Sequence, residues 1–410
     1  METPRLRHGA WLVLALLIAV YFLNYFDRQT VSVLKTTLKG EFGMTDSQYS
    51  WIIGAFLGPY IFSYFLSGRV VDRWGSRMSL MLFVALWSLA TVLCGFAGSL
   101  VQLAMARALL GIAEPGCFPA AQRAIVSWFP SERRGFALSL LQPATALGAM
   151  AAPPAVALLT ETWSWHAAFL APGILGFIWI FFWLPADRQP QPRATAGAVA
   201  SREAPVPLRE LFRDSRLWAV IGARLISDPL WYFFLFWLPG YLQEKMHLSL
   251  SEVGRVTWIP SLVAAVVGVL LARYSDALIA RGKLNPIQSR VFVLKLVAFG
   301  SPLCLCITSI DNVTLALTVI SAVWCVCQVW FFYTSALLAE IFPVNAAGSA
   351  LGIVGGMGAL GGLLFNLAAG PTIDAVGYTA LFALASCLHP LAAWLLHRKF
   401  RSEVREVALA

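Results

Sequence analysis

Charged residues are scarce in this chain. They make up 12% of its 410 residues, whereas 59% of the residues are hydrophobic. A soluble domain carries roughly 25% charged residues, so this chain has too few of them to cover a surface exposed to water. Their scarcity leaves long uncharged runs along the whole sequence. This composition excludes a water-soluble globule and predicts an integral membrane protein.

Sequence motifs for catalysis and metal binding are also lacking. The chain contains no phosphate-binding loop, metal-ligand cluster or Ser/His/Asp pattern, and its loops are too short to hold an enzyme domain. The seven cysteines lie in or beside apolar runs, and the two closest pairs are spaced i, i+2, which points their thiols to different faces of a helix. We therefore expect no catalytic residue, no metal and no cofactor.

Twelve apolar stretches reach the length of about 20 residues that a bilayer-spanning helix needs. They cover residues 11–34, 49–71, 78–97, 100–128, 135–160, 164–184, 218–242, 253–273, 290–309, 312–341, 347–370 and 378–397. The sequence therefore predicts an all-α integral membrane fold with twelve transmembrane helices.

The basic residues are unevenly distributed among the loops. A net charge of +9 could indicate a nucleic-acid partner. With the N-terminus in the cytoplasm, however, the outer loops hold only Lys35, Lys39, Lys245 and Arg255, and all other Lys and Arg residues outside the spans are cytoplasmic. This is the positive-inside rule of membrane proteins. It predicts a multi-pass protein of the inner cell membrane, in contact with lipid and not with nucleic acid, with both termini cytoplasmic.

One long polar segment interrupts the apolar stretches. Residues 185–217 are rich in Pro, Ala and Arg, a composition typical of linkers. They separate six predicted spans in residues 1–184 from six in residues 218–410. The end of this segment, residues 207–218, is compatible with a short surface helix.

The two halves resemble each other. Asp72 precedes Arg77 by five residues after the second stretch, and Asp276 precedes Arg281 by the same distance after the eighth. A Phe-Pro pair followed by Gly five residues later recurs after the fourth and tenth stretches. Two matches at corresponding places indicate a duplicated six-helix unit. Parallel repeats of this kind place a substrate site at their interface, near the middle of the membrane.

The loop after the second stretch resembles a gating motif of the major facilitator superfamily. With the six-plus-six organisation and the linker, the resemblance extends over essentially the whole chain. It implies two pseudo-symmetric six-helix bundles that transport by alternating access, and we expect a monomer. The motif residues, with their counterparts in the second half, are Gly68, Asp72, Arg73, Gly75, Arg77, Asp276 and Arg281.

A narrower resemblance is to the anion:cation symporter family, whose members move organic anions with protons. The run from Ala223 to Pro239 is similar to the hexuronate transporters within that family. The resemblance implies a small organic anion as substrate, carried with protons. Its other marks are the run Asn24-Tyr25-Phe26-Asp27-Arg28, the spaced set Arg107, Gly111, Glu114 and Pro119, and Gln142.

Six charged residues fall in the middle of predicted spans. A charged side chain in the bilayer core costs about 2.5–3.5 kcal/mol on the insertion scale, so such residues face the bundle interior and indicate function. The six are Asp27, Arg28, Arg107, Glu114, Arg224 and Asp228.

Arg28 is the predicted anion-binding residue, because its planar guanidinium can hold a carboxylate with two hydrogen bonds and because the family places an anion-binding Arg here. The alternative is a fixed ion pair with Asp27 or Glu114. Asp27 and Glu114 are predicted to carry the coupling proton, since burial and a nearby cation oppose each other in setting the charge of a carboxyl. Permanent salt bridges are the alternative for both. Arg107 shares a helix face with Glu114 and is assigned a supporting charge.

Three polar residues complete the predicted substrate site: Tyr25, Tyr60 and Gln142. Two departures from the family pattern leave the substrate open, because Tyr64 and Gly355 stand where relatives carry Gln and Asn. The glycines of the eleventh stretch are interpreted as a close-packing surface.

Arg224 and Asp228 are four residues apart and can pair on one helix face. We interpret them as a supporting structural pair rather than as substrate ligands.

Together these features predict a secondary active transporter that imports a sugar acid, specifically a hexuronate, with protons. Two alternatives stay open. One is a facilitator or exporter of another small organic anion, aromatic or dicarboxylic. The other is a membrane sensor that does not transport, although no signalling domain is attached to support it. The chemistry of transport requires no enzyme activity.

Overall fold

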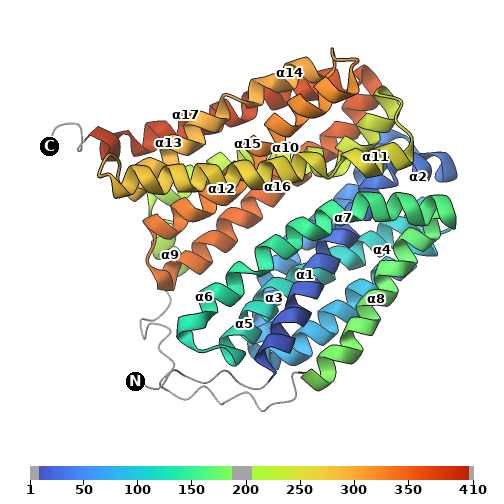
Figure 1. The fold of residues 1–410 in the computed structure, drawn as a ribbon, viewed down its shortest axis with the longest axis horizontal. Helices are drawn as coiled ribbons and strands as arrows, with labels where there is room; N and C mark the ends of the chain where they lie inside the picture. The colour runs from blue at the N-terminus through green and yellow to red at the C-terminus, as the bar shows by residue number, and fades with distance from the viewer. Residues whose placement is uncertain (1–8, 187–205, 406–410) are drawn as a thin grey trace. The chain divides into compact units, whose positions relative to one another are not determined.

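A computed structural model describes residues 9–186 and 206–405. Every regular element within these residues is a helix, as Figure 1 shows. Eleven helices in the described part are long and apolar enough to cross a membrane. The protein is therefore an all-α, multi-pass membrane protein, as its composition predicts.

The helices follow the predicted spans in order. Before the linker they are α1 Ala10–Val33, α2 Lys35–Phe42, α3 Asp46–Gly95, α4 Leu100–Ala113, the 3-10 turn η1 Glu114–Gly116, α5 Cys117–Trp128, α6 Ser131–Ser139, α7 Leu141–Thr162 and α8 Trp165–Ala186. After it they are α9 Leu208–Leu211, α10 Ser215–Lys245, α11 Leu250–Val256, α12 Ile259–Ala280, α13 Pro286–Ala298, η2 Ser301–Leu303, α14 Cys304–Ile307, α15 Val313–Ile341, α16 Val344–Val376 and α17 Thr379–Arg405.

The second and third predicted spans both lie in α3. Gly75 divides α3 into two arms, because its backbone adopts φ 74° and ψ 173° instead of helical angles. Such a positive φ is readily reached only by glycine. The stretch of α3 that qualifies as a membrane span, Leu66–Gly95, runs across this break. The predicted span 49–71 lies in the first arm and is not counted separately, which accounts for eleven spans instead of twelve.

The contacts group the chain into two compact units. Among the described residues, the first comprises 9–44, 51–186 and 236–258, and the second comprises 45–50, 206–235 and 259–405. Each unit thus includes one short segment from the other half of the sequence, at the start of α3 or the end of α10. The division into bundles at residues 185–217 stays a prediction, and the described end of that segment contains the short helix α9.

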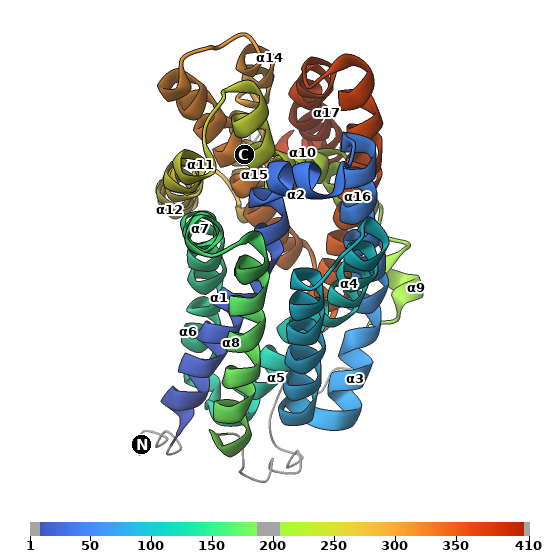
Figure 2. The same ribbon diagram turned by 90° about the vertical axis from the view of Figure 1, so that its right-hand side faces the viewer.

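In the first unit, α1 lies against α7 and α8 (Figure 2). A Cβ atom on Gly148 of α7 would lie 2.2 Å from the Phe22 carbonyl oxygen of α1. Glycine therefore lets the two backbones approach to a distance that any other residue would prevent. Small residues at helix contacts are the usual device in membranes, where the lipid supplies no hydrophobic drive for helices to associate.

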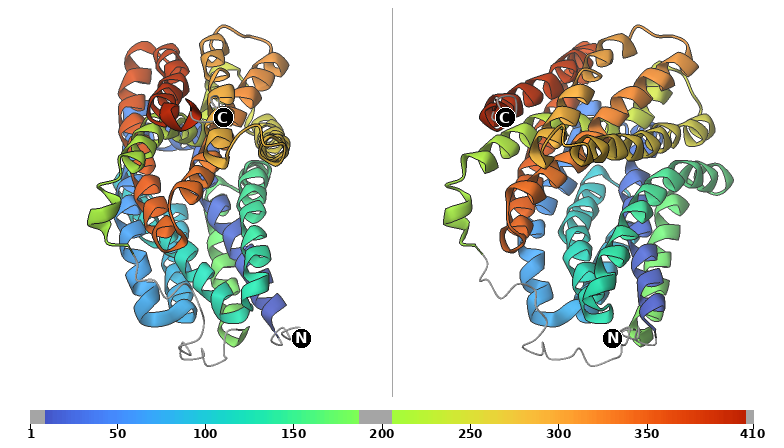
Figure 3. Two further views of the ribbon diagram at one scale, coloured as in Figure 1. Left: turned by 90° about the vertical axis from the view of Figure 1, so that its left-hand side faces the viewer. Right: turned by 60° about the vertical axis from the view of Figure 1, so that its left-hand side comes forward.

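In the second unit, the helices from α15 to α17, orange to red in Figure 3, run beside one another. Their buried apolar side chains pack with those of α10 and α13, and the Trp330 indole of α15 donates to the Leu294 carbonyl of α13 at 3.0 Å. A Cβ on Gly361 of α16 would lie 2.3 Å from the Leu225 carbonyl oxygen of α10. Close packing is thus confirmed for this glycine, whereas Gly352 and Gly355 have no heavy atom within 4 Å of a Cβ.

Candidate functional site

A buried ion pair in the first unit joins Arg28 to Glu114. Arg28 donates to Glu114 Oε2 from NH2 at 2.6 Å and from Nε at 3.1 Å. The Arg28 side chain is 6% exposed and that of Glu114 is fully buried. The second carboxyl oxygen, Oε1, has no hydrogen-bond partner among the described residues. This pair is one of the alternatives that the sequence left open for Arg28, and the Oε1 atom offers a place for a proton.

Three aromatic rings surround the Arg28 guanidinium. Its Cζ lies 4.9 Å from the ring centroids of Tyr25 and Tyr60 and 5.6 Å from that of Phe56. A guanidinium over such ring faces gains about 0.5–2 kcal/mol, depending on its desolvation. The structure therefore brings Arg28, Tyr25, Tyr60 and Glu114 together, with flat apolar walls around a cationic centre.

A break in the fourth predicted span positions Glu114. Helix α4 ends at Ala113, and Glu114–Gly116 forms a 3-10 turn before α5 begins. Pro115 has no N–H to donate to the preceding turn, so the regular α-helical bonding stops here. Short 3-10 segments inside a helix often mark functional sites. The predicted span 100–128 is confirmed in its bounds, and the Pro-Gly pair was the signal for the turn inside it.

Close packing of α4 on α3 places Phe56 between two arginines. A Cβ on Gly111 would lie 2.2 Å from the Phe56 carbonyl oxygen, so only glycine permits this approach. The centroid of the Phe56 ring lies 4.5 Å from the Cζ of Arg107, a fully buried residue of α4. Sequence analysis did not identify Phe56; its place four residues before Tyr60, on one face of α3, was the available signal.

Asp27 is a buried carboxyl beside this pair. It is 1% exposed, and its oxygens accept no hydrogen bond in the described residues, although Thr91 offers a hydroxyl beside it. Glu114 and Arg107 are charged groups near it. An ionised carboxylate without donors is costly to bury, by several kcal/mol. A protonated Asp27 avoids that cost, and Arg107 offsets part of it when Asp27 is ionised.

Two further polar residues complete the account of this region. The side chain of Gln142 lies outside the described residues. Asn24, one turn before Arg28 on α1, is fully buried, and its amide atoms have no hydrogen-bond partner in the part of the chain that the structure describes. In the sequence, Asn24 stood out only as the first residue of the run from Asn24 to Arg28. A buried amide without partners is costly unless water or a ligand satisfies it.

In the second unit, Arg224 and Asp228 form the ion pair that their spacing predicts. Arg224 Nε and NH2 each lie 2.8 Å from Asp228 Oδ2. The NH1 group donates to the Thr334 hydroxyl at 2.9 Å and to the Phe331 carbonyl at 3.1 Å. Three fixed groups therefore hold Arg224, in keeping with a supporting structural role.

Comparison with known proteins identifies the family. A family model described as Major Facilitator Superfamily matches residues 17–321, which is more than half of the chain. The chain belongs to the Major Facilitator Superfamily. Its members are membrane transporters and not enzymes. This confirms the prediction that the protein is a transporter and the prediction that it is not an enzyme.

Two curated relatives and one solved structure show what this facilitator resembles. It is 28% identical to the hexuronate transporter of Escherichia coli K12, with 94% of this chain and 93% of the relative covered. It is 31% identical to the probable sulfoacetate transporter SauU of Cupriavidus necator, with 84% and 82% covered. A crystal structure of a D-xylose-proton symporter matches with a TM-score of 0.77 at 16% identity, covering 95% of this chain and 97% of the other. The last comparison shows the fold alone.

The loop that resembles the superfamily motif lies around the Gly75 break. Asp72 pairs with Arg123 of α5 at 3.2 Å, and its side chain is 83% exposed. Arg77 NH2 donates to the Leu184 carbonyl at the end of α8, at 2.8 Å. Both residues thus connect α3 to another helix, but not to each other. Arg73 is exposed, and a Cβ on Gly68 would meet no heavy atom within 4 Å.

The corresponding loop of the second half is arranged differently. Asp276 pairs with Arg290 at the start of α13, at 3.0 Å. Arg281 is exposed, and its side chain makes no hydrogen bond or ion pair with the described residues. The sequence therefore repeats the five-residue spacing from Asp to Arg, but in neither half does this Asp pair with the Arg that follows it.

Proposed function

We propose that this facilitator imports a sugar acid, specifically a hexuronate, together with protons. The observation that carries the proposal is the Arg28–Glu114 pair inside its aromatic box. Arg28 is a carboxylate-binding fork, and its partner Glu114 is a group that a proton can neutralise. Similarity to a hexuronate transporter over nearly the full length of both chains supports the choice of anion.

The pair couples the two ligands through competition for one guanidinium. When Glu114 takes up a proton, its attraction for Arg28 weakens, and the substrate carboxylate can replace it there. The rings of Tyr25 and Tyr60 then flank the apolar face of the sugar, and their hydroxyls can reach its polar groups. Asp27 supplies a second protonation site beside Arg107. Binding of the anion is therefore favoured by prior binding of a proton.

Import of an anion needs this coupling. The membrane potential opposes entry of each net negative charge by about 2.3 kcal/mol per 100 mV. One proton makes the cycle of a monovalent anion electroneutral, and two make it electrogenic. We further propose that the protein works as a monomer in the inner membrane with both termini cytoplasmic, as the distribution of basic residues predicts.

A second candidate substrate class is a smaller organic anion. The similarity to a probable sulfoacetate transporter favours it, and the same Arg28 fork suits a small acid. Uptake into proteoliposomes, driven by an inward proton gradient, separates the candidates: galacturonate and glucuronate are compared with sulfoacetate, and xylose serves as the neutral control. Accumulation of a hexuronate above all others supports the proposal. Accumulation of sulfoacetate alone overturns the substrate assignment, and accumulation of none overturns proton-driven import of these acids.

A further inference from the structure

Four basic residues gather where α13 meets α17, outside the proposed substrate site. Helix α13 lies against α17 (Figure 1). The Nζ of Lys295 on α13 lies 3.3 Å from the Nδ1 of His397 on α17. Arg401 is a further charged group near His397, and Arg398 adjoins it in the sequence. We call these four residues the basic cluster: Lys295, His397, Arg398 and Arg401.

The basic cluster lacks an anion among the described residues. None of its members forms an ion pair with a carboxylate of the described part of the chain. Lys295 is partly buried and falls inside the candidate span Pro286–Ile307, where a charged side chain is costly unless it is paired or reaches the headgroups. His397 is also partly buried, inside the span Thr379–Arg401. Two basic nitrogens side by side without a counter-ion indicate that an anion from outside the chain completes the site.

The basic cluster offers hydrogen-bond donors of the kind that a phosphate group needs. The Lys295 ammonium has several N–H donors and uses one of them on His397 Nδ1. With Nδ1 as the acceptor, the neutral imidazole carries its proton on Nε2, which is a further donor. Arg398 adds a planar guanidinium, whose donors match the oxygens of a phosphate. The cluster therefore combines positive charge with donors from two helices.

The exposed face of α17 is apolar first and basic afterwards. Leu391 and Trp394 are exposed, and Arg398 and Arg401 follow them on the same helix face, at intervals of three and four residues. The Arg398 Cζ lies 5.7 Å from the centroid of the Trp394 ring. Tryptophan is enriched at the boundary between lipid tails and headgroups. A phospholipid has the same order as this helix face, because its apolar chains end at an anionic phosphate.

Helix α13 adds an apolar surface beside Lys295. Phe292, Leu296 and Phe299 are all exposed. Phe292 and Phe299 lie three residues before and four residues after Lys295, so the three share one helix face. Because the chain is a multi-pass membrane protein, exposed apolar side chains within a span are in contact with lipid tails. Acyl chains can therefore pack against both helices while a headgroup lies at the basic cluster.

We propose that the basic cluster binds the phosphate headgroup of one anionic phospholipid, whose acyl chains lie along the exposed apolar faces of α13 and α17. Every residue of this site belongs to the second compact unit, so the site is complete within that unit. Charge complementarity selects an anionic lipid, since the headgroup of a zwitterionic lipid brings a cation that the cluster repels. The inference rests on the chain being a membrane protein and not on the anion that it carries. Its failure and the failure of the proposed function are therefore separable.

Native mass spectrometry of the purified full-length protein tests the site by counting the lipids that stay bound. The protein is titrated with phosphatidylglycerol, which is anionic, and with phosphatidylcholine of the same acyl chains, which is zwitterionic. We expect the first phosphatidylglycerol to bind more tightly. Lys295→Gln and Arg398→Gln should each weaken its binding about fivefold, the factor for the ~1 kcal/mol that one basic group contributes beside anionic lipid. Arg398 is exposed, so its variant keeps the test decisive even if Lys295→Gln folds poorly.

Lys399→Gln is the matched control for the loss of one charge from α17. Lys399 adjoins Arg398 in the sequence, but it donates to the Ser215 hydroxyl of α10, so its loss should leave the affinity for phosphatidylglycerol unchanged. Equal affinity for the two lipids, or equal weakening by Lys399→Gln and Arg398→Gln, would overturn the site. Glycerol phosphate, which resembles the headgroup without its chains, is the second control. If it displaces the lipid at equal concentration, a soluble anion is the ligand and the lipid assignment is wrong. Absence of hexuronate uptake by the wild type would overturn only the proposed function.

Discussion

Arg28 and Arg224 are both buried arginines paired with carboxylates, but their partners differ in kind. Arg224 donates to a carboxylate, a hydroxyl and a backbone carbonyl. The hydroxyl and the carbonyl do not change their charge in any cycle. Arg28 donates to Glu114, whose attraction a single proton can switch off. An incoming anion can therefore compete at Arg28, whereas Arg224 stays tied to its own helix and to α15.

Replacing Arg28 with Lys tests its role as a carboxylate fork. Lysine keeps the charge but lacks the planar pair of donors, so we expect Arg28→Lys to weaken binding of the sugar acid by about tenfold or more, or ~1.4 kcal/mol. Equilibrium binding to purified protein measures the change, with Arg255→Lys as the control because Arg255 is exposed on α11. Affinity equal to that of the wild type in Arg28→Lys would remove Arg28 from the substrate site.

At this scale, local spacing predicted some contacts and missed others. The Arg224–Asp228 pair follows from two residues one turn apart on a single helix. The Arg28–Glu114 pair joins residues that are 86 positions apart, and sequence analysis could name it only as one of several alternatives. The Phe56 ring between Arg28 and Arg107 was missed for the same reason, since helix periodicity does not say which helices touch.

Individual helices are held at short distances by single glycines. Gly111 is in contact with the backbone of α3 and thereby places Phe56 beside both arginines. The distance between α4 and α3 is therefore part of the site. Hydropathy located both helices, but it contains no information on how closely they approach.

Gly111→Ala should push α4 away from α3. Its Cβ would lie 2.2 Å from a backbone oxygen, which cannot rotate aside, and overpacking of this kind costs about 1–3 kcal/mol. We expect a lower melting temperature and weaker sugar-acid binding. Gly58→Ala on α3 is the matched control, because no heavy atom of the described residues lies within 4 Å of its Cβ. If both variants melt like the wild type, the close approach does not matter for stability.

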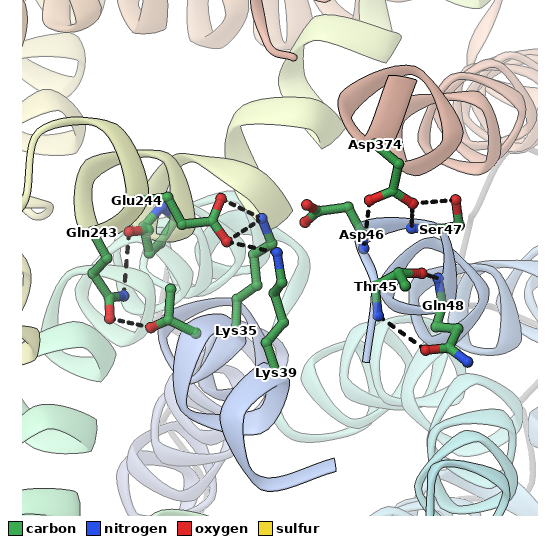
Figure 4. A network of polar contacts seen from close by, with 11 residues as sticks. Lys35, Lys39, Thr45, Asp46, Ser47, Gln48, Gln243, Glu244 and Asp374 are labelled. Atoms are coloured by element: carbon green, nitrogen blue, oxygen red, sulfur yellow. Dashed lines mark hydrogen bonds and ion pairs between the residues drawn. The ribbon is translucent and has the colours of Figure 1, made fainter. Parts of the chain in front are cut away.

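The start of α3 has a carboxylate cap from a distant helix. Asp374 of α16 accepts from the backbone N–H groups of Asp46 at 3.1 Å and Ser47 at 2.8 Å, as Figure 4 shows. A negative charge at a helix N-terminus is worth about 0.3–1 kcal/mol. Thr45 and Gln48 also cap this end with reciprocal hydrogen bonds.

Asp374→Asn should therefore loosen the first turn of α3 without unfolding the protein. We expect faster hydrogen exchange at residues 46–50 and a loss of stability no larger than about 1 kcal/mol. Exchange measured by mass spectrometry checks this, and Asp311→Asn, an exposed carboxyl before α15, is the control. Unchanged exchange at the start of α3 would show that the Thr45–Gln48 cap suffices there.

The order of the helices was predictable because each needs a long apolar run, but hydropathy alone did not show their interruptions. The fourth predicted span contains the turn at Glu114, and the ninth contains η2 and α14. Both turns have a proline as their second residue. Hydropathy averages over such a residue, so a window long enough to find a span is too long to find its kink.

At the scale of the whole molecule, the duplicated sequence does not produce two equivalent charge systems. The first unit contains an ion pair beside an aromatic box and a second carboxyl at Asp27, whereas the second unit contains the fixed Arg224–Asp228 pair. The repeat predicted the six-plus-six organisation. A repeat predicts only the features that both halves share. It could not predict this asymmetry, because the Glu114-Pro-Gly break occurs in the first half alone. Coupling of protons to substrate is therefore expected to reside in the first unit.

Driven uptake and exchange separate that coupling from binding. Glu114→Gln cannot take up or release a proton, so we expect it to abolish accumulation driven by a pH gradient in proteoliposomes. The variant should still bind the sugar acid and exchange it in counterflow, because a neutral amide leaves Arg28 available to the substrate carboxylate. Asp27→Asn should impair the same driven uptake, since it removes the second protonation site. Accumulation at the wild-type level in both variants would move the coupling proton elsewhere, and Asp228 would be the next carboxyl to test, because among the described residues it is a further carboxyl buried in the middle of a span.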